Sequence, residues 1–390
     1  METKILAALA NTDNNDERID YYIKNGSWIL DYQMIYIDEE KGNDKAKQLE
    51  YVTKLGFECN SLYYSGKLFC VDRRFLTNSL NKTNTNYNYK LIVTFDTQII
   101  SQLPIFLEKP NHSDEILQKV IDLCKSGECS FDCIPYIIEN ILLIDDLSET
   151  YPYLYKTLLA FETLFPWQNG FTSTDIEKRV KELLQFYKSK DFTKVKQRLF
   201  IKFHIEYLFL LSIVYINLKH KRCTARTKFD KFLEFCDKVI GKFEPTANNL
   251  AFLYFENQNL KFFKKIKDTN KDILADIKNM AWDIFHVRQL VDYATFTFED
   301  SDTIYIPVFI SKDKGLNEIR HAFQIKCMIV HSKNKLNRIP SYKMSVLEYD
   351  DENYKKYYNE EAFRIRNQRS CNILKLVSKL EKLVCDEIYK

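Results

Sequence analysis

The sequence predicts an α/β fold in which a small sheet is interrupted by a long, mostly helical insertion. Continuous apolar runs, typical of strands covered on both faces, occur at 90–95 and 303–311, and a third run follows at 324–330. Between the first two runs, from 114 to about 290, the apolar residues recur with helical periodicity. Strands separated by helices are the pattern of an α/β sheet, and 390 residues are enough for such a core with further segments.

Along the chain, polar helical segments and short alternating stretches come first and end in an Asn- and Thr-rich run at 78–90 that predicts a linker. The stretch 97–108 after the strand at 90–95 predicts a short helix that is stopped by Pro104 or by a turn around it. Helices are then predicted at 113–124, 133–144, 173–187, 194–218, 228–240, 247–263 and 271–297. Pro307 restricts the strand at 303–311 to an edge position or to a place near its first residue. A short helix at 317–323, the strand at 324–330 and an amphipathic helix at 369–390 complete the chain.

These segments predict three parts. Residues 1–88 form an N-terminal accessory region, and residues 89–345 form the α/β core with its helical insertion at about 146–270. Residues 346–390 form a C-terminal helical extension.

Composition excludes several classes of function. The net charge is +3, so no global field demands a polyanionic partner. Only 8 glycines are present, and neither a P-loop nor a dinucleotide-binding motif occurs. The ten cysteines form no CxxC pair, which favours free thiols in a reducing compartment. No signal peptide is recognisable, and the apolar run at 207–218 is too short to cross a bilayer, so we expect a cytoplasmic protein without a membrane segment.

Two carboxylates follow predicted strands directly. Asp96 comes after the strand at 90–95, and Asp313 follows the run that ends at Ser311. If the two strands are parallel, both acids emerge at the carboxyl edge of the sheet, where α/β proteins bind their ligands. The sequence therefore predicts a site at this edge.

Two further acids lie on predicted helices. Glu139 stands among apolar neighbours in "PYIIENILLI", where a buried charge needs a partner, and Asp283 borders the apolar face of its helix. Four carboxylates brought together would repel one another and would hold Mg²⁺ or Mn²⁺, which prefer oxygen ligands. Such a site hydrolyses phosphodiesters.

At these residues the sequence resembles the PIN-domain ribonucleases. The matching stretches are "TFDTQII", "YIIENIL", "AWDIFHVRQL" and "ISKDKGL". The resemblance implies a PIN-like parallel sheet flanked by helices, and catalytic metal ligands at Asp96, Glu139, Asp283 and Asp313, with Thr97 and Ser311 as supporting polar groups. Gln98 stands where the family usually has Asn, and Glu162 is the substitute should Glu139 not be the second acid.

The resemblance implies a metal-dependent endoribonuclease that hydrolyses RNA. Lys312, Lys314 and Arg320 would hold the scissile phosphate. Family analogy adds a toxin or antiviral defence role, an inhibitory or activating protein partner and homo-oligomer formation. A basic stretch at 218–231 resembles a surface that follows a phosphate backbone, or equally a solvated helix junction.

Two alternatives stay open. Arg198 and His204 in "RLFIKFH" resemble the HEPN ribonucleases, which cleave RNA without a metal. The chain would otherwise be a non-catalytic scaffold, derived from a PIN fold, that binds a protein partner. Metal dependence separates the three functions.

Overall fold

The computed structural model describes the ranges 2–12, 14–40, 43–44, 59–63, 67–81, 87–109, 115–125, 129–142, 147–165, 171–266, 272–293, 303–331, 338–343, 356–357, 359–369 and 371–388. They belong to two compact units. The first comprises Met1–Ile134, Arg288–Lys312 and Gln324–Lys343. The second comprises Pro135–Val287, Asp313–Phe323 and Met344–Lys390.

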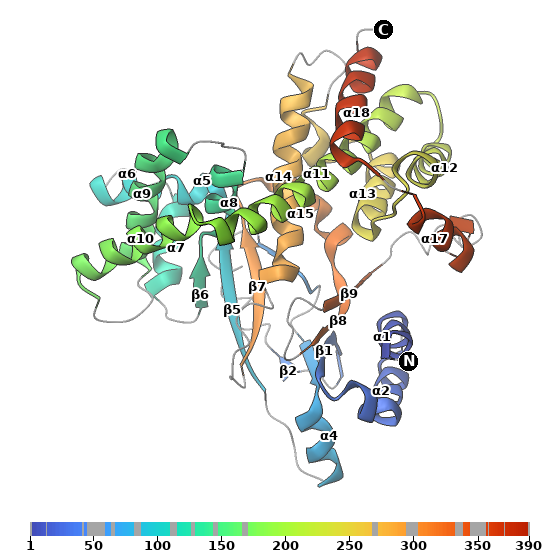
Figure 1. The fold of residues 1–390 in the computed structure, drawn as a ribbon, viewed down its shortest axis with the longest axis horizontal. Helices are drawn as coiled ribbons and strands as arrows, with labels where there is room; N and C mark the ends of the chain where they lie inside the picture. The colour runs from blue at the N-terminus through green and yellow to red at the C-terminus, as the bar shows by residue number, and fades with distance from the viewer. Residues whose placement is uncertain are drawn as a thin grey trace. The chain divides into compact units, whose positions relative to one another are not determined.

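The first unit contains a four-stranded sheet in which three neighbouring strands run parallel (Figure 1). Its strands, in spatial order, are β3 (Cys59–Ser61), β7 (Thr303–Ile310), β5 (Asn88–Phe95) and β6 (Cys129–Asp132). β5 runs parallel to both β7 and β6, with Phe95 opposite Ile310, whereas β3 is antiparallel to β7. Both predicted strands are therefore present, and their carboxyl ends lie at the same edge.

Pro307 lies inside β7 at a place where the sheet tolerates it. A proline cannot donate a hydrogen bond to a neighbouring strand. β7 is bordered by β5 along its whole length, but β3 pairs only with Val308, Phe309 and Ile310. Among the described residues, no strand therefore pairs with Pro307 on the side where β3 lies. This part of β7 is an edge of the sheet, which is where the sequence allows a proline.

A second, five-stranded sheet in the first unit is antiparallel. Its order is β2 (Asn43–Asp44), β4 (Lys67–Val71), β1 (Tyr32–Ile37), β8 (Ile325–His331) and β9 (Arg338–Tyr342). The helices α1 (Glu2–Asn11) and α2 (Asn15–Ile29) bury Ile5, Leu9 and Tyr22 against this sheet. Because β1 pairs with β8, the N-terminal region shares a sheet with residues far along the chain, which differs from the sequence-based division at 88.

α4 (Arg73–Leu80) packs against β4 of the antiparallel sheet and against α2. Three short helices lie between β5 and β6 in the chain: α5 (Thr97–Ile100), α6 (Leu103–Glu108) and α7 (Glu115–Lys125). The short helix expected after Asp96 is present as α5 and ends before Pro104, and a second helix, α6, follows it. Pro104 lies in the first turn of α6, where its missing N–H would have no partner in any case, so the proline begins a helix instead of limiting one.

The second unit is helical. Its first helices are α8 (Ile134–Leu142), α9 (Leu147–Leu164), α10 (Ser173–Tyr187) and α11 (Lys190–Lys219). They are followed by α12 (Ala225–Phe235) with a π-helical turn (Cys236–Ile240), α13 (Pro245–Glu256) and a 3₁₀ turn (Lys261–Phe263). The remaining elements are α14 (Ile273–Tyr293, in this unit to Val287), α15 (Lys314–Ile319) with a 3₁₀ turn (Arg320–Phe323), α17 (Glu360–Asn367) and α18 (Ile373–Ile388). The expected helices over 173–187, 194–218 and 271–297 are present.

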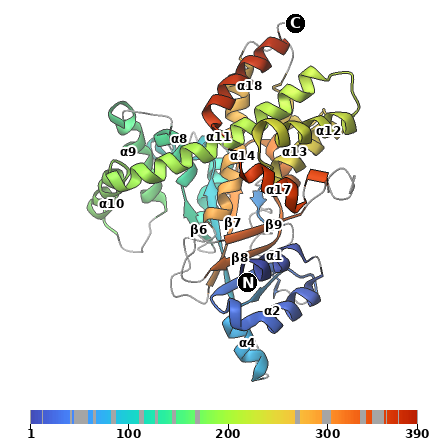
Figure 2. The same cartoon turned by 45° about the vertical axis from the view of Figure 1, so that its right-hand side comes forward.

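α11 is the central helix of this unit and packs along α18 (Figure 2). Among the described residues, α11 is the one helix long and apolar enough to cross a membrane, and 67% of its most apolar window is buried inside the structure. Burial of that kind is typical of a core helix.

The amino end of α10 is closed by side-chain hydrogen bonds. α10 is capped by Thr172, whose hydroxyl accepts from the backbone N–H of Asp175 while the Asp175 carboxylate accepts from the backbone of Thr172. This reciprocal pair is a capping box. The molecule as described is mixed α/β, with a small parallel sheet flanked by helices.

Candidate functional site at the carboxyl edge of the parallel sheet

In the first unit, Asp96 lies at the carboxyl edge of the parallel sheet. Its backbone N–H donates to the carbonyl of Ile310, which continues the β5–β7 ladder for one residue. Its side chain is buried, caps α5 through the N–H of Gln98 at 3.4 Å and accepts from the Ser311 hydroxyl at 2.6 Å. The sequence-predicted pair Asp96 and Ser311 is thus brought together, because β5 and β7 end side by side.

A second acid lies at the same edge. Asp132 is the last residue of β6 and stands opposite Thr94, whose hydroxyl donates to its carboxylate at 2.6 Å. The backbone N–H of Ile134 donates to its other oxygen at 3.0 Å. Burial raises the pKa of Asp132 to about 6, and these hydrogen bonds counteract that rise only in part. We call Thr94, Asp96, Asp132 and Ser311 the strand-end cluster.

A cation adjoins the strand-end cluster. Lys312 follows Ser311 and donates from Nζ to the side-chain oxygen of Gln102 at 3.0 Å. This hydrogen bond holds the Lys312 side chain against Gln102. Thr97, the first residue of α5, is partly buried.

Asp313, Lys314 and Arg320 belong to the second unit. Asp313 caps α15, accepting from the N–H of Gly315 at 2.7 Å, and its other oxygen lies 4.0 Å from Nζ of Lys265. A Cβ at Gly315 would meet the backbone of Phe262 at 2.8 Å, so only glycine fits beside this cap. Lys314 and Arg320 are exposed.

Glu139 also lies in the second unit, on α8, and is partly exposed. Its carboxylate is 3.8 Å from Nε2 of His286 on α14, a buried ring stacked on Trp282. A histidine thus stands where the sequence suggested a lysine, an arginine or a metal. Asp283, one turn before His286, is partly buried.

The substitute acid Glu162 is buried on α9 and already has a strong partner. Nε of Arg179 on α10 donates to its carboxylate at 3.0 Å. This ion pair accounts for the buried charge without a metal.

The residues of the metal-free alternative, Arg198 and His204, lie on α11 six positions apart, which places them about 120° apart around the helix. Nδ1 of His204 bonds the carbonyl of Phe200 at 2.8 Å, so Nδ1 carries the proton and Nε2 the lone pair. Burial lowers the pKa of His204. Arg198 is exposed.

The basic stretch at 218–231 is in part a helix junction. Lys228 is buried and donates to the side chain of Asn217 at 2.8 Å, and burial lowers its pKa. Lys219 donates to the hydroxyl of Tyr215. Lys228 therefore joins α12 to α11, whereas the bond of Lys219 lies within α11. Lys221, Arg222 and Arg226 are exposed.

Metal ligation can be tested against the donors present. Within the described ranges, no group of three or more His, Cys, Asp or Glu side chains is arranged to hold a metal ion. Magnesium, however, is commonly held by one or two carboxylates together with substrate phosphates. Asp96 offers one such carboxylate at the sheet edge, with hydroxyl oxygens of the same hard character beside it.

Sequence reasoning did not identify Asp132. Its strand has only four residues, Cys129–Asp132, and this stretch stood out in the sequence for its cysteines. The cysteines Cys129 and Cys133 are buried free thiols, in line with the expectation of free thiols. An acid directly after an apolar residue and before the predicted helix at 133–144 was the signal that could have identified it.

Comparison of the chain with protein-family models, curated proteins and solved structures found no match.

Proposed function

We propose that this chain is a metal-dependent endoribonuclease with a PIN-like core, and that the strand-end cluster is part of its active site. The observation that supports this proposal is the parallel pairing of β5 and β7, which puts Asp96 and Ser311 in contact at the carboxyl edge of the sheet. Two carboxylates and a fixed lysine at one sheet edge favour phosphodiester hydrolysis over the rival functions.

In this proposal Asp96 is a ligand of Mg²⁺ or Mn²⁺, and Ser311 orients its carboxylate. When bound, the ion would polarise the scissile phosphate and lower the pKa of the attacking water. Lys312, steadied by Gln102, would attract the RNA phosphate. The resemblance assigns Glu139, Asp283 and Asp313 to the same chemistry.

Asp132 takes the role of a proton carrier in this proposal. A carboxyl with a pKa of about 6 exchanges its proton near neutral pH, which suits general acid or base catalysis. Thr94 donates to one oxygen and the backbone of Ile134 to the other, so the group is held in one orientation.

The decisive experiment measures cleavage of labelled single-stranded RNA with Mn²⁺, with Mg²⁺ and with chelator. Asp96→Asn keeps the size of the side chain but removes its charge, and we expect its activity to fall at least about 100-fold. Asp20→Asn is the control, because Asp20 is an exposed acid on α2 in the same unit. Circular dichroism establishes that both variants are folded.

Equal activity of wild type and Asp96→Asn would refute the proposal. Cleavage that survives chelator and is lost in Arg198→Ala would support the metal-free alternative instead. No cleavage under any of the conditions would favour the scaffold.

A further inference from the structure

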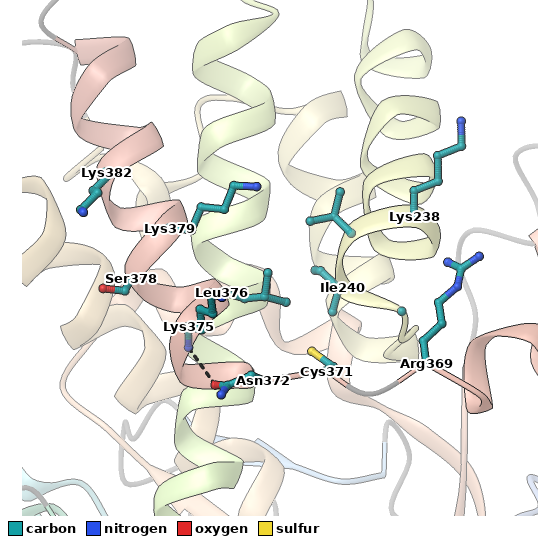
Figure 3. Close-up of a pocket in the computed structure, with 12 residues that line it drawn as sticks. Lys238, Ile240, Arg369, Cys371, Asn372, Lys375, Leu376, Ser378, Lys379 and Lys382 are labelled. Atoms are coloured by element: carbon teal, nitrogen blue, oxygen red, sulfur yellow. Dashed lines mark hydrogen bonds between the residues drawn. The ribbon is translucent and has the colours of Figure 1, made fainter.

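The second unit contains a cavity of about 920 Å³ whose wall is strongly basic. It lies between the end of the π-helical turn and the first turns of α18 (Figure 3). Among the described residues that line it, five are cations and none is acidic: Lys238, Arg369, Lys375, Lys379 and Lys382. We call this cavity the basic pocket.

Three of the five cations are concentrated on α18. Lys375, Lys379 and Lys382 are spaced by four and three residues, so they share one face of the helix and repel one another. They are exposed, and within the described ranges none of them forms an ion pair or hydrogen bond with an acidic side chain. Their charge is therefore available to an anion in the pocket.

The opposite wall is fixed by hydrogen bonds. Arg369 donates to the backbone carbonyl of Asp237 at 2.7 Å, and the buried Arg366 donates to the Asp237 carboxylate at 2.9 Å. Gly241, with φ of +71°, ends the π-helical turn in the left-handed region that favours glycine. These contacts join α17 to the turn before α18 begins, so the pocket is largely preformed.

The helix end contributes to the same field. Asn372 and Cys371 line the pocket at the start of α18, and the Asn372 side chain accepts from the backbone N–H of Lys375 at 3.0 Å (Figure 3). The amino end of a 16-residue helix carries partial positive charge, which adds to that of the lysines.

The apolar part of the wall limits the kind of ligand. Val239, Ile240 and Leu376 line the cavity, and Figure 3 shows Leu376 and Lys379 extending from α18 toward the side where Ile240 lies. Surfaces that bind single-stranded RNA combine cations with aromatic rings on which bases stack, and none of the described lining residues is aromatic. The volume is that of a small-molecule site.

We infer that the basic pocket binds a small polyphosphorylated molecule of nucleotide size, with its phosphates against Lys375, Lys379 and Arg369 and its less polar part against Leu376 and Ile240. The inference concerns a cavity separate from the strand-end cluster and does not rest on the proposed nuclease activity.

The test is direct binding of three probes to the full chain by calorimetry: ATP, inorganic tripolyphosphate and a single-stranded RNA oligonucleotide. We expect ATP and tripolyphosphate to bind saturably, with ATP tighter because it also contacts the apolar wall. Lys375→Ala/Lys379→Ala should weaken both roughly tenfold or more, since each lost lysine removes a charge-assisted contact.

The matched control is Lys190→Ala/Lys194→Ala, a pair of exposed lysines with the same four-residue spacing on α11. Circular dichroism and melting temperature verify that both double variants fold. The affinity of wild type should also fall as salt rises.

Three results would overturn the inference. They are no binding of either phosphate probe below about 1 mM, equal weakening in the control pair, and pocket-dependent binding of RNA alone. Since no cleavage is measured, failure here leaves the nuclease proposal to its own test.

Discussion

The strand-end cluster consists of two pairs in which a hydroxyl donates to a carboxylate, whereas the basic pocket contains three exposed lysines on one face of α18 that repel one another. In the cluster, each polar group lies in a strand or directly after one and already has a protein partner. In the pocket, the three lysines of α18 lack such partners among the described residues. The first arrangement is typical of a preorganised reaction site, because its groups cannot reorient freely. The second is typical of a binding site, because its exposed charges are held by no protein partner among the described residues and can contact a ligand.

The largest effect is expected from removing the support of the cluster. Phe309 is fully buried in β7 and stands opposite Thr94 on β5. We expect Phe309→Ala to lower the free energy of unfolding by roughly 3–5 kcal/mol, because the cavity that it leaves adds to the lost burial. Denaturant unfolding followed by circular dichroism measures this change.

The matched aromatic control is Tyr153→Ala on α9, whose side chain is 74% exposed, with an expected change within about 0.5 kcal/mol. A similar loss in both variants would contradict the view that buried strands hold the cluster.

The next effect uses pH to distinguish the partly buried acid Asp132 from an exposed one. The ordinary pKa of this carboxyl is 3.8, and burial in the fold raises the pKa of Asp132 to about 6. Between these values the folded state keeps a proton that the unfolded state has lost, so the free energy of unfolding falls as pH rises from about 4 to about 6. The whole loss is at most about 3 kcal/mol and persists above pH 6.

Asp132→Asn cannot ionise, so its free energy of unfolding should lack this fall across pH 4 to 7. Asn offers a single acceptor oxygen to Thr94 and Ile134, and the resulting loss of a hydrogen bond is independent of pH. The test of Asp132 is therefore the difference between wild type and Asp132→Asn in the slope of the free energy of unfolding against pH. Asp122→Asn on α7, an exposed acid, should keep the wild-type slope. Parallel curves for wild type and Asp132→Asn would refute the assignment of the raised pKa.

The two regions also differ in how far the sequence could predict them. Asp96 and Ser311 were predictable because apolar strand runs reveal where strands end, and parallel strands end at one edge. Asp132 was missed because four residues are too few to give a strand signal. The N-terminal strands gave no hint of their pairing with β8, since pairing between distant segments has no local sequence pattern.

The basic pocket was even less predictable from the sequence, because it too depends on contacts between distant segments. The lysines of α18 are visible in the sequence as an ordinary solvated face of an amphipathic helix. Their meeting with Lys238 depends on contacts of Arg366 and Arg369 with Asp237, more than a hundred residues away. Similarly, Lys228 in the basic stretch looked available for phosphate, but it is buried against Asn217.

The smallest effect tests whether the lysines of α18 are under repulsion. Lys379 lies four residues after Lys375 and three before Lys382, and like charges at these spacings destabilise a helix by about 0.2–0.5 kcal/mol per pair. Lys379→Gln should therefore raise the free energy of unfolding by about 0.5 kcal/mol at low salt. At about 1 M NaCl the gain should vanish, because screening removes the repulsion between exposed charges. Lys178→Gln on α10 should instead lower the free energy of unfolding, because Nζ of Lys178 lies 4.0 Å from the Glu182 carboxylate and the substitution removes this attraction. A change of the same sign in both variants, or a gain that persists at high salt, would contradict the view that the α18 lysines repel one another.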